Sequence, residues 1–398
     1  MRKLYMEQLE PGLALARAIY NDRGDVLLAR GVMLTSRYIS ALEALGFYAV
    51  YVSDGIGDDL DPPEVLSEQL RVATYKHVRE LFDVVQNVTS LHGKAGRQDA
   101  LTQLSTSTGP QVAQLYRDVE KIVDEVMTAD TLSGVASLKS HDSYTFEHSV
   151  EVTVAGVMLG KRLYLPPQEL HQLALGCLCH DIGKADIPTE ILSKPGRLSE
   201  EEFAVVMEHP RAGYEAVQQF LRSSDNIARH VVWQHHERQD GNGYPRGLHG
   251  NNSFGGTMDL RFDKSLILPS AEIAAVADVY AALASDRPYR RALKPPQIIA
   301  TLRDMSGSHL NRELVRRFLS ILPTYPVGSE VMIISGSLQG HRGVVTEVNP
   351  IEVHRPKVRV MLDPEDRKLT PFEVDTKVDR QIELATTSYS EEAQLISA

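Results

Sequence analysis

The chain has 398 residues, of which 42% are hydrophobic and 24% charged. This is the composition of a globular protein long enough for two or three domains. Its 42 basic and 53 acidic side chains give a net charge of −11, which argues against a general binder of nucleic acid polymers or anionic membrane surfaces. An anionic ligand must therefore be attracted by a local basic cluster.

The N-terminal stretch "MRKLYMEQLEPGLALARAIY" has no apolar core of signal-peptide length, and no later stretch approaches the roughly 18 apolar residues of a membrane span. We therefore expect a cytoplasmic protein without a membrane partner. The only cysteines, Cys177 and Cys179, lie two residues apart in the helical pattern "LHQLALGCLCHD". They point in different directions there, which favours core packing over a redox or metal role.

Residues 1–56 contain short β-rich runs around a turn at 21–24, together with the helical pattern "SRYISALEALG". They predict a small α+β module. The acidic, proline-containing "DGIGDDLDPP" then indicates a linker, and the rest of 57–130 is a helical segment with amphipathic spacing. Such spacing usually reflects core burial, but helices of this kind also form dimers, so a homodimer through this segment is the alternative.

Residues 131–322 contain several further helical patterns and nearly all the residues that suggest chemistry. From 323 to 385, "GSEVMIISGSLQGHRGVVTEVNP" and "RPKVRVMLD" alternate apolar and polar residues around glycine turns, which predicts a small β-barrel. Residues 386–398 form a loosely ordered tail. The expected architecture is thus multidomain, with an all-α core between a small α+β module and a small C-terminal β-barrel.

Histidines and aspartates with recognisable surroundings recur through the middle region. "HDSYTFEHSVEV", "CHDIGK", "MEHPRAGYEAV", "QHHERQDGNGYP" and "AAVADVYAAL" supply His148, His180, Asp181, His209, His235, His236 and Asp278. A lone histidine on a helix is usually structural, but this succession of imidazoles and carboxylates, without nearby thiolate ligands, suits divalent iron, manganese or zinc. In a His-Asp pair the histidine can bind one ion while the carboxylate bridges to a second, as in two-metal hydrolases.

The order "HDIGK", "ILSKPGRLSEEEF", "HP", "HHERQDGNGYP" and "ADVYAALASDRPYR" resembles the HD-GYP family, a branch of the HD metal-dependent phosphohydrolases. The resemblance covers roughly residues 131–322. The N-terminal module resembles one often found ahead of HD-GYP domains, and the C-terminal region resembles a common extension after them. The resemblance implies a helical phosphodiesterase in bacterial second-messenger signalling, which cuts cyclic di-GMP to pGpG and in some members onward to GMP.

The resemblance also implies a role for each matching residue. One ion would be held by His148, His180, Asp181 and Asp278, and Asp181 would bridge to a second ion held by His209, His235 and His236. The adjacent histidines require a helix that ends there, and the following "DGNGYP" predicts that end. The metals would be two ions of iron or manganese. The expected catalytic residues are Asp181 and Lys184, and the expected substrate contacts are Lys184, Tyr244, Arg287 and Arg290.

Several positions depart from the family pattern. Tyr144 stands where some members carry a glutamate for a third metal, which favours a dinuclear site. Gln239, Glu272 and Ala281 replace a usual tryptophan, arginine and aspartate. The chain also has an insertion at 251–265, which is either a neutral surface loop or, with the GYP loop, a lid or protein-partner site.

Two alternative functions therefore remain beside hydrolysis of cyclic di-GMP. One is a catalytically weak receptor that binds the nucleotide and signals through its flanking domains. The other is a hydrolase of a related cyclic dinucleotide such as cyclic GMP-AMP.

Overall fold

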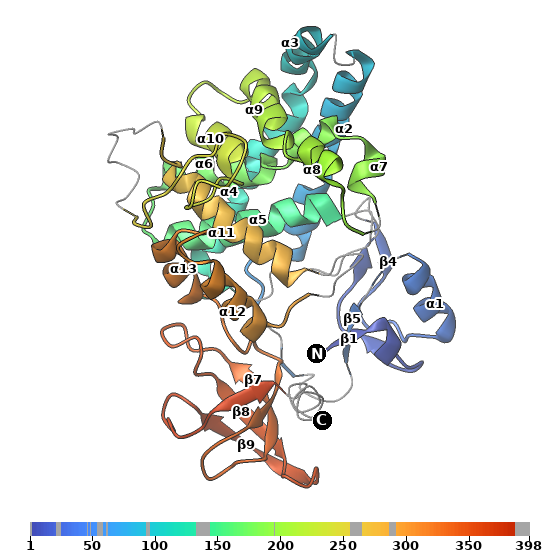
Figure 1. Cartoon of the computed structure of the whole chain (residues 1–398). Helices are drawn as coiled ribbons and strands as arrows, with labels where there is room; N and C mark the ends of the chain where they lie inside the picture. The colour runs from blue at the N-terminus through green and yellow to red at the C-terminus, as the bar shows by residue number, and fades with distance from the viewer. Residues whose placement is uncertain are drawn as a thin grey trace.

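The computed structural model of the chain is mostly helical, with an α+β unit at its N-terminus and a sheet at its C-terminus (Figure 1). In Figure 1 the N-terminal unit lies to the right of the helical body and the C-terminal sheet lies below it. The structure describes residues 2–20, 25–45, 47, 49–53, 59–60, 63–92, 96–132, 144–194, 196–254, 265–285 and 292–386.

The N-terminal unit has its own small core. Its helix begins after Thr35, whose side chain accepts a hydrogen bond from the Tyr38 amide at 3.2 Å and so caps the first turn. Three strands form an antiparallel sheet in the order β1-β5-β2, and β3 pairs with β4. The turn predicted at 21–24 lies outside the described residues. The elements are β1 (Arg2–Tyr5), η1 (Met6–Gln8), β2 (Ala14–Leu15), β3 (Ile19–Tyr20), β4 (Val26–Leu28), α1 (Ser36–Ala44) and β5 (Ala49–Ser53).

The helical segment expected between the module and the catalytic region packs directly into the helical body. It comprises α2 (Glu68–His92), α3 (Arg97–Ser107) and α4 (Gly109–Thr128). Buried Leu81 and Ile122 belong to the same apolar cluster as Leu173 and Phe318, from later helices. The amphipathic faces of these helices are therefore buried within the chain itself, in one core that extends from residue 65 to residue 322.

The later helices are arranged so that those carrying histidines meet. Helix α5 packs against α6 and α11, α6 packs against α10, and η2 packs against α9. The contact of η2 with α9 requires a glycine, because a Cβ at Gly183 would lie 2.0 Å from the carbonyl oxygen of His209 and 2.4 Å from the amide nitrogen of Gly213. The elements are α5 (Tyr144–Arg162), α6 (Pro167–Cys179), η2 (Ile182–Asp186), α7 (Thr189–Leu192), α8 (Glu200–Val206), α9 (His209–Phe220), α10 (Asn226–Gln234), α11 (Pro269–Ala284), α12 (Pro295–Met305) and α13 (Arg312–Leu319).

The C-terminal region is a five-stranded antiparallel sheet in the order β10-β6-β7-β8-β9. Its buried side chains, among them Val331, Val345 and Val358, form a separate core. The expected barrel is not closed by backbone pairing in the described part of the chain, because β9 pairs only with β8 and β10 only with β6. Of the predicted tail, 387–398 lie outside the described residues. The strands are β6 (Glu330–Ile333), β7 (Arg342–Glu347), β8 (Lys357–Leu362), β9 (Lys368–Asp375) and β10 (Leu384–Thr386).

None of the helices described combines the length and the apolar character needed to cross a lipid bilayer.

Candidate metal centre

The structure brings together all seven histidines and aspartates that the sequence proposes as metal ligands. Most of them lie at helix ends, where a short loop or the next helix directs the side chain inward. His148 and Asp278 lie within α5 and α11, His180 and Asp181 join α6 to η2, His209 begins α9, and His235 and His236 directly follow α10. The predicted end of the helix before the histidine pair is confirmed, since α10 ends at Gln234.

The ligand atoms form two clusters joined by one carboxylate. In the first cluster, ligand atoms of His148, His180 and Asp278 lie within 4.8 Å of one another, and His148 Nε2 is 2.8 Å from an Asp278 oxygen. In the second, ligand atoms of His209, His235 and His236 meet within the same distance.

Asp181 lies between the two clusters. Its Oδ2 is 3.4 Å from Nε2 of His180, and its Oδ1 is 3.3 Å from Nε2 of His209. One oxygen therefore faces each cluster, which is the geometry required of a bridging carboxylate.

Backbone carbonyls fix the orientation of three of the imidazoles. Nδ1 of His180 lies 2.7 Å from the carbonyl oxygen of Cys177, Nδ1 of His209 lies 2.7 Å from that of Val206, and Nδ1 of His235 lies 2.9 Å from that of Val232. Each carbonyl belongs to the last turn of a helix, where the ordinary helical N–H partner is missing. When Nδ1 donates to this carbonyl, a neutral ring presents the lone pair of Nε2 to the centre.

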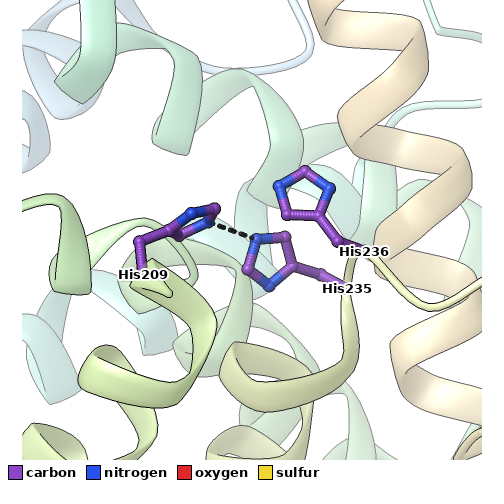
Figure 2. A group of neighbouring side chains, drawn as sticks. All are labelled: His209, His235 and His236. Carbon is purple, nitrogen blue, oxygen red and sulfur yellow. Dashed lines mark hydrogen bonds between the residues drawn. The ribbon is translucent and has the colours of Figure 1, made fainter. Parts of the chain in front are cut away.

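The close approach of His209 and His235 indicates whether a cation fits the site. Their Nε2 atoms lie 3.2 Å apart, with the His236 ring beside them (Figure 2). Because Nδ1 is the donor in both rings, neutral imidazoles would direct two lone pairs at each other, which is unfavourable unless a cation lies among them. The donor set of imidazole nitrogens and carboxylate oxygens suits a divalent transition-metal ion.

Burial keeps two histidines of the second cluster, His235 and His236, in the neutral form that binds metals. Burial lowers the pKa of His235 well below its usual value, and the neighbouring His236, His180 and His209 lower it further. Burial and His209 also lower the pKa of His236, to about 3. Both rings are therefore neutral at physiological pH and available as ligands without loss of a proton.

The first cluster holds the carboxylates in their ionised form. Burial acts to raise the pKa of Asp181, but His180 and Lys184 hold it well below its usual value. Burial opposes ionisation of Asp278 in the same way, and its hydrogen bond and charge interaction with His148 lower its pKa. Burial favours a neutral His180, but the adjacent Asp181 raises its pKa, whereas burial lowers the pKa of His148.

Two of the candidate substrate contacts, Lys184 and Tyr244, lie beside this centre. Lys184 donates from Nζ to Oδ2 of Asp181 at 2.6 Å, so its charge lies beside the bridging carboxylate. The Tyr244 ring stacks on His236, with 4.7 Å between ring centroids, and burial raises the pKa of its phenol. Arg287 and Arg290 lie outside the described residues.

Two residues that contribute to the site, Phe203 and Glu237, were not singled out from the sequence. Phe203 is 48% exposed, and its ring meets Tyr244 edge-on with 6.3 Å between centroids, so it extends the aromatic surface outward from His236. Buried Glu237 accepts hydrogen bonds from the amides of Arg246 and Leu248, both at 2.8 Å, and so anchors the loop that carries Tyr244. The sequence signal for the role of Glu237 was its position directly after the histidine pair.

The residues that depart from the family pattern form a buried network. Gln239 Nε2 donates to one oxygen of Glu272, and Asn311 Nδ2 donates to the other at 3.0 Å. Burial raises the pKa of Glu272 to about 7, against the effect of these two hydrogen bonds. Gln239 also accepts from the Asn252 amide at 3.0 Å, so the network holds the start of the insertion. Residues 255–264 of the insertion lie outside the described part of the chain.

The other proposed positions have simpler outcomes. Ala281 is buried in α11, and Cys177 and Cys179 are free thiols buried in the core, as predicted. Tyr144 is the first residue of α5, and its side chain is not among those described.

Comparison with known proteins identifies the region that holds the centre. The family model described as "HD domain" matches residues 134–314, a little under half of the chain. "Cyclic di-GMP phosphodiesterase PA4108" of Pseudomonas aeruginosa is 33% identical over 258 residues, which are 64% of this chain and 58% of that protein. "3'3'-cGAMP-specific phosphodiesterase 1" of Vibrio cholerae is 36% identical over 182 residues, which are 46% of this chain and 38% of that protein.

The chain thus spans only about half the length of these curated relatives. Among solved structures, Bd1817, a HDG"Y"P protein from Bdellovibrio bacteriovorus, matches with a TM-score of 0.39 and 18% identity, over 80% of this chain and 97% of that chain. That likeness is too distant to bear on function. The matched segment, residues 134–314, and the named relatives together support an HD-GYP domain in this region of the chain.

Proposed function

We propose that this chain is a metal-dependent phosphodiesterase that hydrolyses cyclic di-GMP to linear pGpG, with GMP as a further product. One observation supports this most strongly: two histidine clusters share a buried carboxylate, Asp181, that directs one oxygen toward each. A two-metal arrangement of this kind suits in-line attack on a phosphodiester. The names of the relatives point to cyclic dinucleotides as the substrate class.

The centre would hold two divalent ions, iron or manganese, and use both clusters. His148, His180, Asp181 and Asp278 would hold the first ion, and Asp181, His209, His235 and His236 would hold the second. Bound there, the ions would activate a water molecule as the nucleophile and neutralise charge that develops on the phosphoryl oxygens. The protein supplies these ligands in the protonation states that bind metal ions, because burial keeps His235 and His236 neutral, and Asp181 and Asp278 are held ionised.

Residues at the rim would bind and position the substrate. The Lys184 ammonium is fixed beside Asp181, where it can contact a phosphoryl oxygen or donate a proton to the leaving oxygen. Tyr244 stacks on His236 and Phe203 meets Tyr244, so together they offer aromatic surface on which a guanine base can stack. Phosphate contacts from Arg287 and Arg290 stay a prediction from the sequence.

The direct test is hydrolysis by the full-length chain. Protein purified without oxygen is loaded with Fe(II) or Mn(II) and given cyclic di-GMP, and pGpG is measured by chromatography together with metal content. Asp181→Ala should lose turnover and bound metal. Asp186→Ala is the matched control, because Asp186 ends the short helix η2 that begins directly after Asp181, and it pairs with Arg97 at 2.9 Å, away from both clusters. Full turnover in Asp181→Ala, or none in the loaded wild type, would overturn the proposal.

A second substrate is favoured by one comparison. The Vibrio cholerae relative named as specific for 3'3'-cGAMP is 36% identical over its matched segment. Competition between cyclic di-GMP and 3'3'-cGAMP, measured as the ratio of kcat/KM values, decides between the two substrates. Tight binding of cyclic di-GMP without turnover would indicate the receptor function instead. A homodimer through 57–130 and a partner site at the GYP loop or 251–265 stay predictions.

A further inference from the structure

A groove with several cationic side chains lies between the helical body and the C-terminal sheet. It has a volume of about 410 Å³ and is bounded by α12, α13 and the segment before β8. Figure 1 shows α12 and α13 directly above that sheet. Its polar lining comprises Arg303, Ser306, Arg312, Arg316, Ser320 and His354. In a chain of net charge −11, such a concentration of guanidinium groups requires an explanation.

Few acidic side chains balance these charges. Within the described part of the chain, neither Arg303 nor Arg312 forms an ion pair with a carboxylate. Among the described residues, Arg316 pairs with Glu313 alone, at 3.4 Å, and shares that carboxylate oxygen with Arg317 at the same distance. The groove therefore has an excess of positive charge.

Helix stabilisation accounts for only part of this arrangement. Arg303 and Arg316 lie in the last turns of α12 and α13, where a cation complements the helix dipole. Arg312 is the first residue of α13, the end at which the dipole favours an acidic side chain instead. Its guanidinium lies against Gly307, because a Cβ there would be 2.8 Å from Nη2. Stabilisation of the helix therefore does not explain the position of Arg312.

The rest of the lining fits an anionic ligand of moderate size. Hydroxyl groups of Ser306 and Ser320 stand among the arginines, and Arg162 donates to the Ser320 hydroxyl at 3.1 Å. Buried Val315 and Leu319 supply an apolar floor. Burial and the charge of Arg303 lower the pKa of His354, so this ring is a neutral hydrogen-bonding group. The volume falls in the range of roughly 300–1,000 Å³ typical of small-molecule sites.

We propose that this groove is a second ligand site, which binds a phosphate monoester such as that of a 5'-mononucleotide, with Arg303 and Arg312 as its principal contacts. Guanidinium forks match the oxygens of a doubly charged phosphate, and the apolar floor accommodates a sugar or base. The site is separate from the metal centre and does not depend on its activity.

Backbone and side-chain contacts connect this site to the GYP loop, which carries Gly243, Tyr244 and Pro245. Asn252 donates from Nδ2 to the carbonyl oxygen of Gly307 and accepts from the Arg312 amide, both at 2.9 Å. The Asp240 amide donates to the carbonyl oxygen of Ser308 at 2.9 Å. A ligand bound by Arg312 would therefore contact the segment 307–312, whose hydrogen bonds to Asp240 and Asn252 support the loop that carries Tyr244.

Calorimetric titration of the full-length chain tests the proposal. 5'-GMP, inorganic phosphate and guanosine are titrated separately in the presence of EDTA, so that no phosphate binds through a metal ion. We expect one site per chain for 5'-GMP, with affinity at least tenfold weaker in the double variant Arg303→Gln, Arg312→Gln. Arg367→Gln is the matched control, because this arginine is 73% exposed and pairs with Asp363 in the β8–β9 turn. Circular dichroism verifies that each variant is folded.

The three ligands separate the sources of binding. Phosphate that binds as tightly as 5'-GMP identifies the anion alone as the ligand, whereas binding of 5'-GMP only identifies a nucleotide, and both results support the site. No binding at about 1 mM ligand, equal affinity in the double variant, or guanosine binding as tightly as 5'-GMP would each overturn it.

Discussion

Gly183→Ala tests whether the close approach of η2 to α9 builds the candidate metal centre. The added Cβ would lie 2.0 Å from the carbonyl oxygen of His209, and real Cβ contacts essentially never fall below 3.0 Å. The two elements must therefore separate by at least about 1 Å. Overpacking of this kind typically costs about 1–3 kcal/mol of the free energy of unfolding. The same displacement separates Asp181 from His209, whose atoms are 3.3 Å apart.

The expected result is a loss of bound metal and of turnover together. A misplacement of about 1 Å at a reacting centre can cost roughly 100-fold in rate. Urea denaturation gives the free energy of unfolding, elemental analysis gives the metal content, and chromatography gives the rate of pGpG formation. Gly109→Ala is the control, because Gly109 begins α4 and nothing lies within 4 Å of an added Cβ there. If Gly183→Ala retains wild-type metal content and rate, close contact of η2 with α9 is not what positions Asp181.

Three further changes test other parts of the site. Glu272 has a folded-state pKa of about 7 against a reference value of 4.5, so its contribution to stability is present below pH 4.5 and is lost as pH rises through 7. Relative to Glu272→Gln, the wild type should lose about 3 kcal/mol of unfolding free energy between pH 4.5 and 8, and parallel denaturation curves for the two proteins would contradict this. Phe203→Ala should raise KM severalfold with kcat kept, because it removes stacking surface but no reacting group; Leu192→Ala, also exposed, is its control. Lys184→Ala should lower kcat by roughly 100-fold or more while metal content stays, and an unchanged kcat would exclude Lys184 from the reaction.

The sequence predicts which residues form the candidate metal centre better than it predicts the contacts that position them. Residue types and motif order, with the family resemblance, select the seven candidate ligands, and the turn-forming residues after His236 predict the end of α10. The carbonyl partners of the histidine Nδ1 atoms could not be predicted, because they depend on where α6, α8 and α10 end in three dimensions. The need for glycine at 183 is equally hidden, since it arises from contact with a helix more than 25 residues further along the chain.

For the fold as well, the sequence predicts the local elements but not how they pack together. Amphipathic spacing in 57–130 correctly indicates a buried face, but periodicity does not say against which surface that face packs. Alternation in 323–385 correctly predicts strands. It cannot predict closure of a barrel, because closure depends on pairing between the first and last strands rather than on the pattern within each. The Gln239 and Glu272 positions read as isolated departures in the sequence, and only their proximity to Asn311 reveals a single polar network.

The continuous core from α2 to α13 sets the smallest piece of this protein that can fold. The matched domain begins at residue 134, yet Leu81, Leu115 and Ile122 from upstream helices are fully covered by it or by one another. Removing that layer uncovers apolar side chains worth about 1.5–3 kcal/mol each, and a handful of them equals the roughly 5–15 kcal/mol that holds a typical domain together. Recombination between relatives is therefore expected to exchange α2 through α13 as one cassette, with its boundaries in the two connecting segments that precede α2 and follow α13.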